Sequence, residues 1–145
     1  MQLTAATIDY AAEHVFMHGG CAALAIALHD ETGWPLVAIT DADNCHDGHI
    51  GMGGSALHWT VRHPSGQLLD ILGLHTQDDL VAEFHDVADG GEVAAAVADR
   101  DYVIDEYVIA RGEPTPITVA ATFVAPVLEL AVEQLTGTPT QSSAL

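Results

Sequence analysis

The chain contains no lysine, and its only basic residues other than histidine are Arg62, Arg100 and Arg111. Against them stand 21 acidic residues, which give a formal net charge of −18. Nucleic-acid binding needs clustered Lys and Arg side chains to neutralise phosphates, so this composition argues against nucleic acid as a partner. It argues equally against an anionic membrane surface. The acidity is explained by solubility or by salt adaptation, and both explanations stay open.

Long apolar runs and cysteines are also scarce. The apolar stretch 117–132 is interrupted by Pro126 and Glu129 and falls short of the roughly 20 residues of a membrane-spanning helix, so it is better interpreted as a core helix. The N-terminal residues lack a basic segment followed by an apolar one, which predicts no secretory signal and a cytoplasmic protein. Without such a signal, Cys21 and Cys45 are expected to be free thiols rather than a disulfide.

The order of the predicted elements defines the fold class. A chain of 145 residues, 49% hydrophobic, fits one domain, which we assign to residues 1–136, with 137–145 as a disordered tail. Helices first, then mostly sequential strands, then a helix favour an α+β domain with N-terminal helices packed on a small antiparallel sheet and a C-terminal helix. The pattern predicts helices at 4–17, 21–29, after Thr76 and at 117–135 with a kink or restart at Pro126, and strands at 36–40, 56–62, 67–72 and 102–110.

Cys21 stands directly after Gly19 and Gly20 and begins an apolar run typical of a buried helix. The N-terminus of a helix favours negative charge and so lowers the pKa of a thiol placed there. The two glycines would let a substrate approach closely, and the N–H groups of Cys21 and Ala22 would then be free to stabilise an oxyanion. A buried structural cysteine is the alternative interpretation.

The segment from His63 to Gly66 has the sequence of a type I turn followed by a left-handed glycine. A three-residue bulged loop would pair His63 with Gln67, and this register puts His58 and Asp70 on one face of the sheet as diagonal neighbours. A two-residue turn would put them on opposite faces. A carboxylate behind a histidine fixes its tautomer and stabilises its protonated form, as proton transfer requires. An ordinary strand histidine on the surface is the alternative.

Three motifs carry a resemblance to a known superfamily. Gly20-Cys21-Ala22, Leu57-His58-Trp59 and Leu69-Asp70-Ile71 resemble, in order and spacing, the transglutaminase-like branch of the papain-like superfamily, which also includes arylamine N-acetyltransferases. The resemblance covers residues 19–73. Papain-like enzymes usually place a glutamine just upstream of the cysteine as an oxyanion donor, whereas the nearest polar side chains here are His14 and His18.

The resemblance implies a thiol-dependent enzyme in which Cys21 is the nucleophile, His58 the base and Asp70 the residue that orients the base. Such an enzyme forms a thioacyl intermediate and needs no cofactor or metal. Its substrate would be a peptide, a protein or a small amide or ester, and hydrolysis, deamidation, transamidation and acetyl transfer all stay open. Trp59, Gly20 and His18 are expected in the substrate cleft.

Two other functions compete with this interpretation. Residues 41–54 form a predicted exposed, mobile loop in which Cys45, His46 and His49 offer zinc-type ligands, with Asp43 or Asp47 nearby and His58 as a further candidate. Their spacing fits no standard zinc signature. The second alternative is a catalytically inactive interaction or structural protein with the same fold, because one fold hosts many functions.

Overall fold

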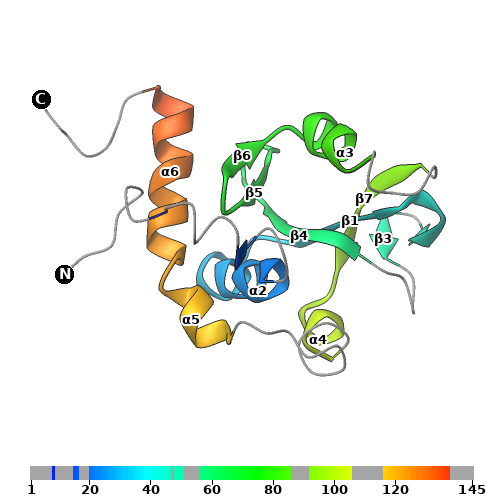
Figure 1. The fold of residues 1–145 in the computed structure, drawn as a ribbon, viewed down its shortest axis with the longest axis horizontal. Helices are drawn as coiled ribbons and strands as arrows, with labels where there is room; N and C mark the ends of the chain where they lie inside the picture. Colours follow the sequence, from blue (N-terminus) through cyan, green and yellow to red (C-terminus); the bar gives the residue numbers. More distant parts are fainter. Residues whose placement is uncertain are drawn as a thin grey trace, which may run out of the picture.

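A computed structural model of the chain describes residues 8, 15–16, 20–46, 48–50, 56–85, 92–105 and 116–137. These residues form an α+β domain, as the order of elements predicted, with a seven-stranded sheet in the order β2-β3-β7-β1-β4-β5-β6. Figure 1 shows helix α2 on one side of strand β4 and helix α3 on the other. No helix in the described ranges is long and apolar enough to cross a membrane.

The sheet is mixed rather than wholly antiparallel. Its strands are β1 (Leu36–Asp41), β2 (Cys45–His46), β3 (His49–Ile50), β4 (Ala56–Arg62), β5 (Leu68–Asp70), β6 (Gly73–His75) and β7 (Val93–Ala98). Neighbouring strands pair antiparallel except β3 and β7, which run parallel. The predicted antiparallel sheet is therefore wrong at this edge, where β3 comes from the loop over 41–54. Part of that loop is ordered, since it also contains the short helix η2 (Ala42–Asn44).

Strand β7 was not predicted, although it lies beside β1 near the middle of the sheet. Its sequence, Val-Ala-Ala-Ala-Val-Ala, is poor in the β-branched and aromatic residues that signal strands. Small side chains suit this position because Ala95 and Val93 pack against the cluster that includes Leu80 of α3 (Gln77–His85). The strand predicted over 102–110 is wrong at its start, because Tyr102 belongs to helix α4 (Arg100–Val103), and residues 106–110 lie outside the described ranges.

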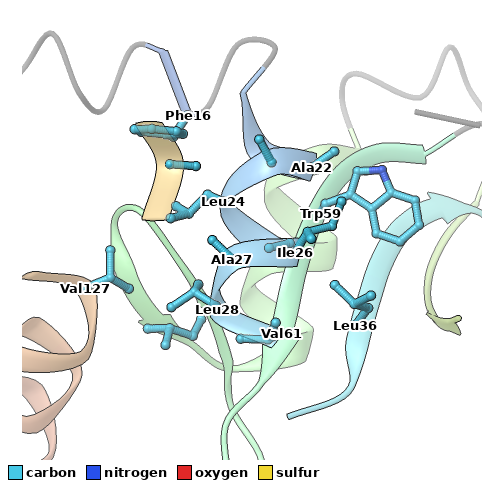
Figure 2. Close-up of a cluster of buried hydrophobic side chains, with 14 of the residues drawn as sticks. Phe16, Ala22, Leu24, Ile26, Ala27, Leu28, Leu36, Trp59, Val61 and Val127 are labelled. Carbon is cyan, nitrogen blue, oxygen red and sulfur yellow. The ribbon is translucent and has the colours of Figure 1, made fainter. Parts of the chain in front are cut away.

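Helix α2 (Cys21–Thr32) is the centre of the main core, as its nearly uniform apolar sequence predicted. Every residue from Ala22 to Leu28 is buried. Strands β1 and β4 supply Leu36, Trp59 and Val61 to the same cluster, and Val127 of α6 packs from the other side (Figure 2). The helix ends at Gly33, whose left-handed φ of 77° lets its N–H bond the carbonyl oxygen of His29 at 2.7 Å. This core fixes the position of Cys21 relative to the sheet.

The C-terminal helix is split, as expected for a restart close to Pro126. Helix α5 (Ile117–Ala121) is followed by α6 (Val124–Thr136), so that Pro126 falls in the first turn of α6, where a missing N–H breaks no helical bond. Gly137 caps α6, and the rest of the predicted tail, 138–145, lies outside the described residues. Most of the predicted helix over 4–17 does too, although Val15 and Phe16 are helical and Phe16 is buried in the main core.

Candidate active site

The hairpin between β4 and β5 has the predicted three-residue loop. The N–H of His63 bonds the carbonyl oxygen of Gln67 at 2.9 Å, and the N–H of Gly66 bonds the carbonyl oxygen of His63 at 2.9 Å. Gly66 has a φ of 92°, the left-handed conformation that the bulge requires. Strand pairing follows the predicted register, with Val61 opposite Leu69. Whether this loop has an odd or an even number of residues determines which side chains of β5 share a face with those of β4.

This register brings His58 and Asp70 together inside the protein. Nε2 of His58 donates a hydrogen bond to Oδ2 of Asp70 at 2.8 Å, and their side chains are 0% and 1% exposed. Phe84 of α3 stacks on the His58 ring with centroids 5.0 Å apart. The imidazole is thus held in one orientation, with its tautomer fixed by the carboxylate and one ring face covered.

The charges of the pair reinforce each other. Burial acts to lower the pKa of His58, but the hydrogen bonds to Asp70 and Cys21 and the charges of both raise that pKa to about 9. Burial likewise acts to raise the pKa of Asp70, and the hydrogen bonds from His58 and His75 lower it to about 2. At neutral pH the pair therefore consists of an aspartate and a protonated imidazole.

Cys21 is the third member of the predicted set and is the first residue of α2. Its thiol is free, half-buried and near enough to the His58 ring to raise the pKa of the imidazole. The Nδ1 atom of His58 is buried and has no hydrogen bond of ordinary geometry to any described residue. Since Nε2 is taken by Asp70, Nδ1 is the ring atom left to exchange a proton with a thiol.

The start of α2 offers the backbone donors that the sequence predicted. The first intrahelical bond of α2 runs from the N–H of Leu24 to the carbonyl oxygen of Gly20 at 3.2 Å. The N–H groups of Cys21 and Ala22 precede it and so have no acceptor within the helix. Gly20, a buried residue, donates its own N–H to Val15 at 2.8 Å. The start of the helix can therefore hold a developing negative charge beside the sulfur.

Trp59 is not a cleft residue, and its predicted role there is wrong. Its side chain is 3% exposed and packs in the main core beside α2 (Figure 2). Side chains alternate along a strand, so the His58 ring points away from Trp59 and stacks on Phe84 of α3. The same ring remains close enough to Cys21, the first residue of α2, for the thiol to raise its pKa. Of the other two predicted cleft residues, Gly20 is buried and His18 lies outside the described ranges.

His75 was missed by the sequence interpretation. It lies on β6, a short strand after Leu72, where the predicted strand ended. Its Nε2 donates to Oδ1 of Asp70 at 2.9 Å, and the backbone N–H of Leu72 donates to the same oxygen at 2.9 Å. The positive φ of 101° at Gly73 makes the tight turn that returns the chain beside β5. The Gly-Leu-His sequence after the aspartate was the available signal for this turn.

The zinc alternative gains no support from the described part of the chain. No group of three or more His, Cys, Asp or Glu side chains there could hold a metal ion. Cys45 contacts the carbonyl oxygen of Ala95 at 3.9 Å, and His49 is an exposed residue of β3. The side chain of His46 and all of Asp47 lie outside the description.

Taken together, the described residues define an α+β domain with a half-buried thiol at a helix start and a buried histidine–aspartate pair next to it. No family model, curated protein or solved structure matches the chain. The arrangement of these side chains is therefore the basis for a functional assignment.

Proposed function

We propose that this protein is a thiol-dependent acyl-transfer enzyme that works through a thioacyl intermediate on Cys21. One observation carries the proposal. The buried His58 ring is bound to Asp70 through Nε2 at 2.8 Å, and Cys21, the first residue of α2, lies close enough to the same ring to raise its pKa. A buried charged pair is costly, and pairs of strongly shifted titratable groups are concentrated at functional sites.

The same arrangement supports a papain-like or transglutaminase-like fold. The proposed nucleophile begins the central helix, and the proposed base and its aspartate stand on adjacent strands, β4 and β5, of the sheet. The buried part of α2 is the apolar helix that this architecture would need behind the thiol. The resemblance in sequence and this order of elements point to the same class.

In the proposed reaction the Cys21 thiolate attacks the carbonyl carbon of an amide, ester or thioester, forming a C–S bond. The negative charge moves to the carbonyl oxygen, which the N–H groups of Cys21 and Ala22 stabilise. His58 gives its Nδ1 proton to the departing amine, alcohol or thiol as the original acyl bond breaks. Water or an amine then attacks the thioester, His58 accepts its proton, and the C–S bond breaks to release the acyl product.

Each residue of this scheme has one task. A protonated imidazole beside a thiol favours the thiolate, the nucleophilic form, and the raised pKa of His58 keeps the ring protonated at neutral pH. Asp70 keeps Nε2 of His58 protonated and orients the ring so that Nδ1 points away from the carboxylate. The net charge of −18 favours neutral or basic peptides, proteins or small amides and esters as substrates.

The pH dependence of iodoacetamide labelling tests the proposal, with Cys45 as an internal reference thiol. We expect Cys21 to label faster than Cys45 near neutral pH. In His58→Ala and Asp70→Asn variants the Cys21 rate should fall by about tenfold or more, because the thiolate loses its counter-charge. The matched control His85→Ala removes an exposed histidine from α3 and should leave the rate unchanged. Equal labelling of both cysteines, unchanged in His58→Ala, would overturn the proposal.

Trapping the intermediate is a second test. Incubation with an activated acetyl ester should add one acetyl group to Cys21 in intact-mass spectra, and the group should be lost on addition of an amine. Cys21→Ser should abolish this labelling, while Cys45→Ser should not. A reactive Cys21 that never acylates would favour the alternative of a catalytically inactive protein with this fold.

A further inference from the structure

The Asp70 carboxylate is held by two histidines rather than one. Oδ2 accepts from His58 at 2.8 Å, and Oδ1 accepts from His75 at 2.9 Å and from the backbone N–H of Leu72 at 2.9 Å. The Asp70 side chain is 1% exposed, so these donors replace the water it would bind outside the protein. The two rings are not equivalent, because the His75 side chain is 18% exposed whereas that of His58 is 0% exposed.

We propose that His75 is a positioning residue of the Cys21 site, which fixes Asp70 from the side opposite His58. The inference rests on the proposed function, because the orientation of His58 matters for catalysis only if His58 exchanges protons at Cys21. Both oxygens of the Asp70 carboxylate are bound, Oδ2 by His58 and Oδ1 by two donors, so the carboxylate cannot turn freely about its terminal side-chain bond. His75 supplies the second donor to Oδ1 and, together with the N–H of Leu72, it sets the plane of the Asp70 carboxylate and, through it, the direction of the His58 ring.

The charge of His75 is coupled to that of His58 because both rings share one carboxylate. The hydrogen bond to Asp70 raises the pKa of His75, burial lowers it, the charges of Asp70 and Glu83 raise it, and the charge of His58 lowers it. Gln134, which hydrogen-bonds Leu74 of β6 from α6, adds no charge. Protonation of His75 therefore weakens the interaction of Asp70 with protonated His58. The reactivity of Cys21 should then depend on the titration of His75 as well as on that of His58.

Two substitutions separate the hydrogen bond from the charge. His75→Gln keeps an N–H donor but cannot titrate, and His75→Phe keeps a ring but has no donor. The readout is the rate of iodoacetamide alkylation of Cys21 as a function of pH. His85→Gln is the matched control, since it removes an exposed histidine in the last turn of α3.

We expect His75→Phe to slow alkylation of Cys21 on the order of tenfold near neutral pH, as loss of a hydrogen bond to a charged group would. His75→Gln should restore most of the rate, and its pH profile should lack the step that His75 contributes in the unmodified protein. If His75 were purely structural, the unmodified protein would show no such step and its profile would coincide with that of His75→Gln. A Gln profile identical to the original, or a Phe variant with the original rate, would overturn the inference.

Nuclear magnetic resonance gives a readout that does not depend on thiol reactivity. The Nε2 proton of His58 should give a strongly downfield signal that persists in His75→Gln and is lost or shifted in His75→Phe. An unchanged signal in His75→Phe contradicts the positioning role. If His58→Ala leaves Cys21 labelling unchanged, the proposed function fails; if labelling collapses there but neither His75 variant differs from the original, only the present inference fails.

Discussion

The N–H of His63 donates to the carbonyl oxygen of Gln67 at 2.9 Å, and this bond closes the loop that sets the register of β4 against β5. In this register His58 and Asp70 share the face of the sheet that packs against α3. Side chains alternate along a strand, so a loop one residue shorter would turn Asp70 to the opposite face. The histidine–aspartate pair therefore depends on the geometry of a loop that touches neither residue.

Gly66 is a position where this loop should be sensitive to substitution, because its backbone is left-handed. A Cβ there would meet nothing within 4 Å, so the cost of a substitution comes from the φ of 92° rather than from a clash of the Cβ. We expect Gly66→Val to lower the free energy of unfolding by about 1–2 kcal/mol, measured by urea denaturation. Gly66→Asn should cost less, because asparagine tolerates left-handed backbone. Equal stability of the Val and Gly proteins would contradict this account.

The sequence was informative wherever local chemistry determines local structure. The turn at 63–66 was predicted because proline and glycine at fixed positions specify a bulged loop, and the alternation along the flanking strands then determined their register. Helix α3 begins after Thr76 as predicted, with the N–H of Asp79 bonded to the Thr76 hydroxyl at 3.1 Å. Helix α2 was recognisable because a helix surrounded by protein needs apolar residues on all sides.

The sequence was uninformative where long-range packing decides. Strand β7 is made largely of alanine, and only its place between β1 and β3 makes these residues extended. Trp59 follows His58, and the sequence did not show which of the two packs in the core around α2. Gly73 could have signalled a turn, but the local sequence did not show that this turn brings His75 to Asp70. Such contacts have no local signature.

The two tryptophans provide a direct check on the placement of Trp59. Trp59 is 3% exposed, whereas Trp34 is half-buried at the end of α2 and contacts the His63 ring. In a Trp34→Phe variant, which retains only Trp59, we expect blue-shifted emission and weak quenching by acrylamide. Trp59→Phe should leave a red-shifted, readily quenched signal from Trp34. Efficient quenching of Trp59 would instead show that its side chain is accessible to solvent, and would contradict its placement in the core.

Gly73 and Gln134 should be energetically coupled. A Cβ at Gly73 would collide with the Gln134 side chain, whose Oε1 accepts from the N–H of Leu74 at 2.7 Å. Gln134→Ala should cost about 1–3 kcal/mol, because it removes the acceptor of a part-buried N–H. Gly73→Ala should then cost less in the Gln134→Ala background than in the original protein, by at least about 0.5 kcal/mol. Strict additivity in a double-mutant cycle of urea unfolding would contradict the coupling.

The pH dependence of stability follows from the buried pair. Folding raises the pKa of His58 from 6.5 to about 9, so its contribution is complete below about pH 6.5 and is lost as the pH rises through about 9. We expect the free energy of unfolding to fall over this range by an amount on the order of 2–3 kcal/mol. His75 adds a smaller loss of the same sign, because its pKa is also raised.

Urea unfolding at a series of pH values measures this slope. His58→Gln does not titrate and should flatten the alkaline slope to the residual part from His75, whereas His85→Gln should keep the original slope. Asp70 has the opposite pH dependence, because folding lowers its pKa from 3.8 to about 2. Its contribution to the free energy of unfolding is therefore lost as the pH drops from about 4 to about 2. Asp70→Asn should remove this acid loss. An alkaline slope that is unchanged in His58→Gln would show that His58 does not titrate with a raised pKa.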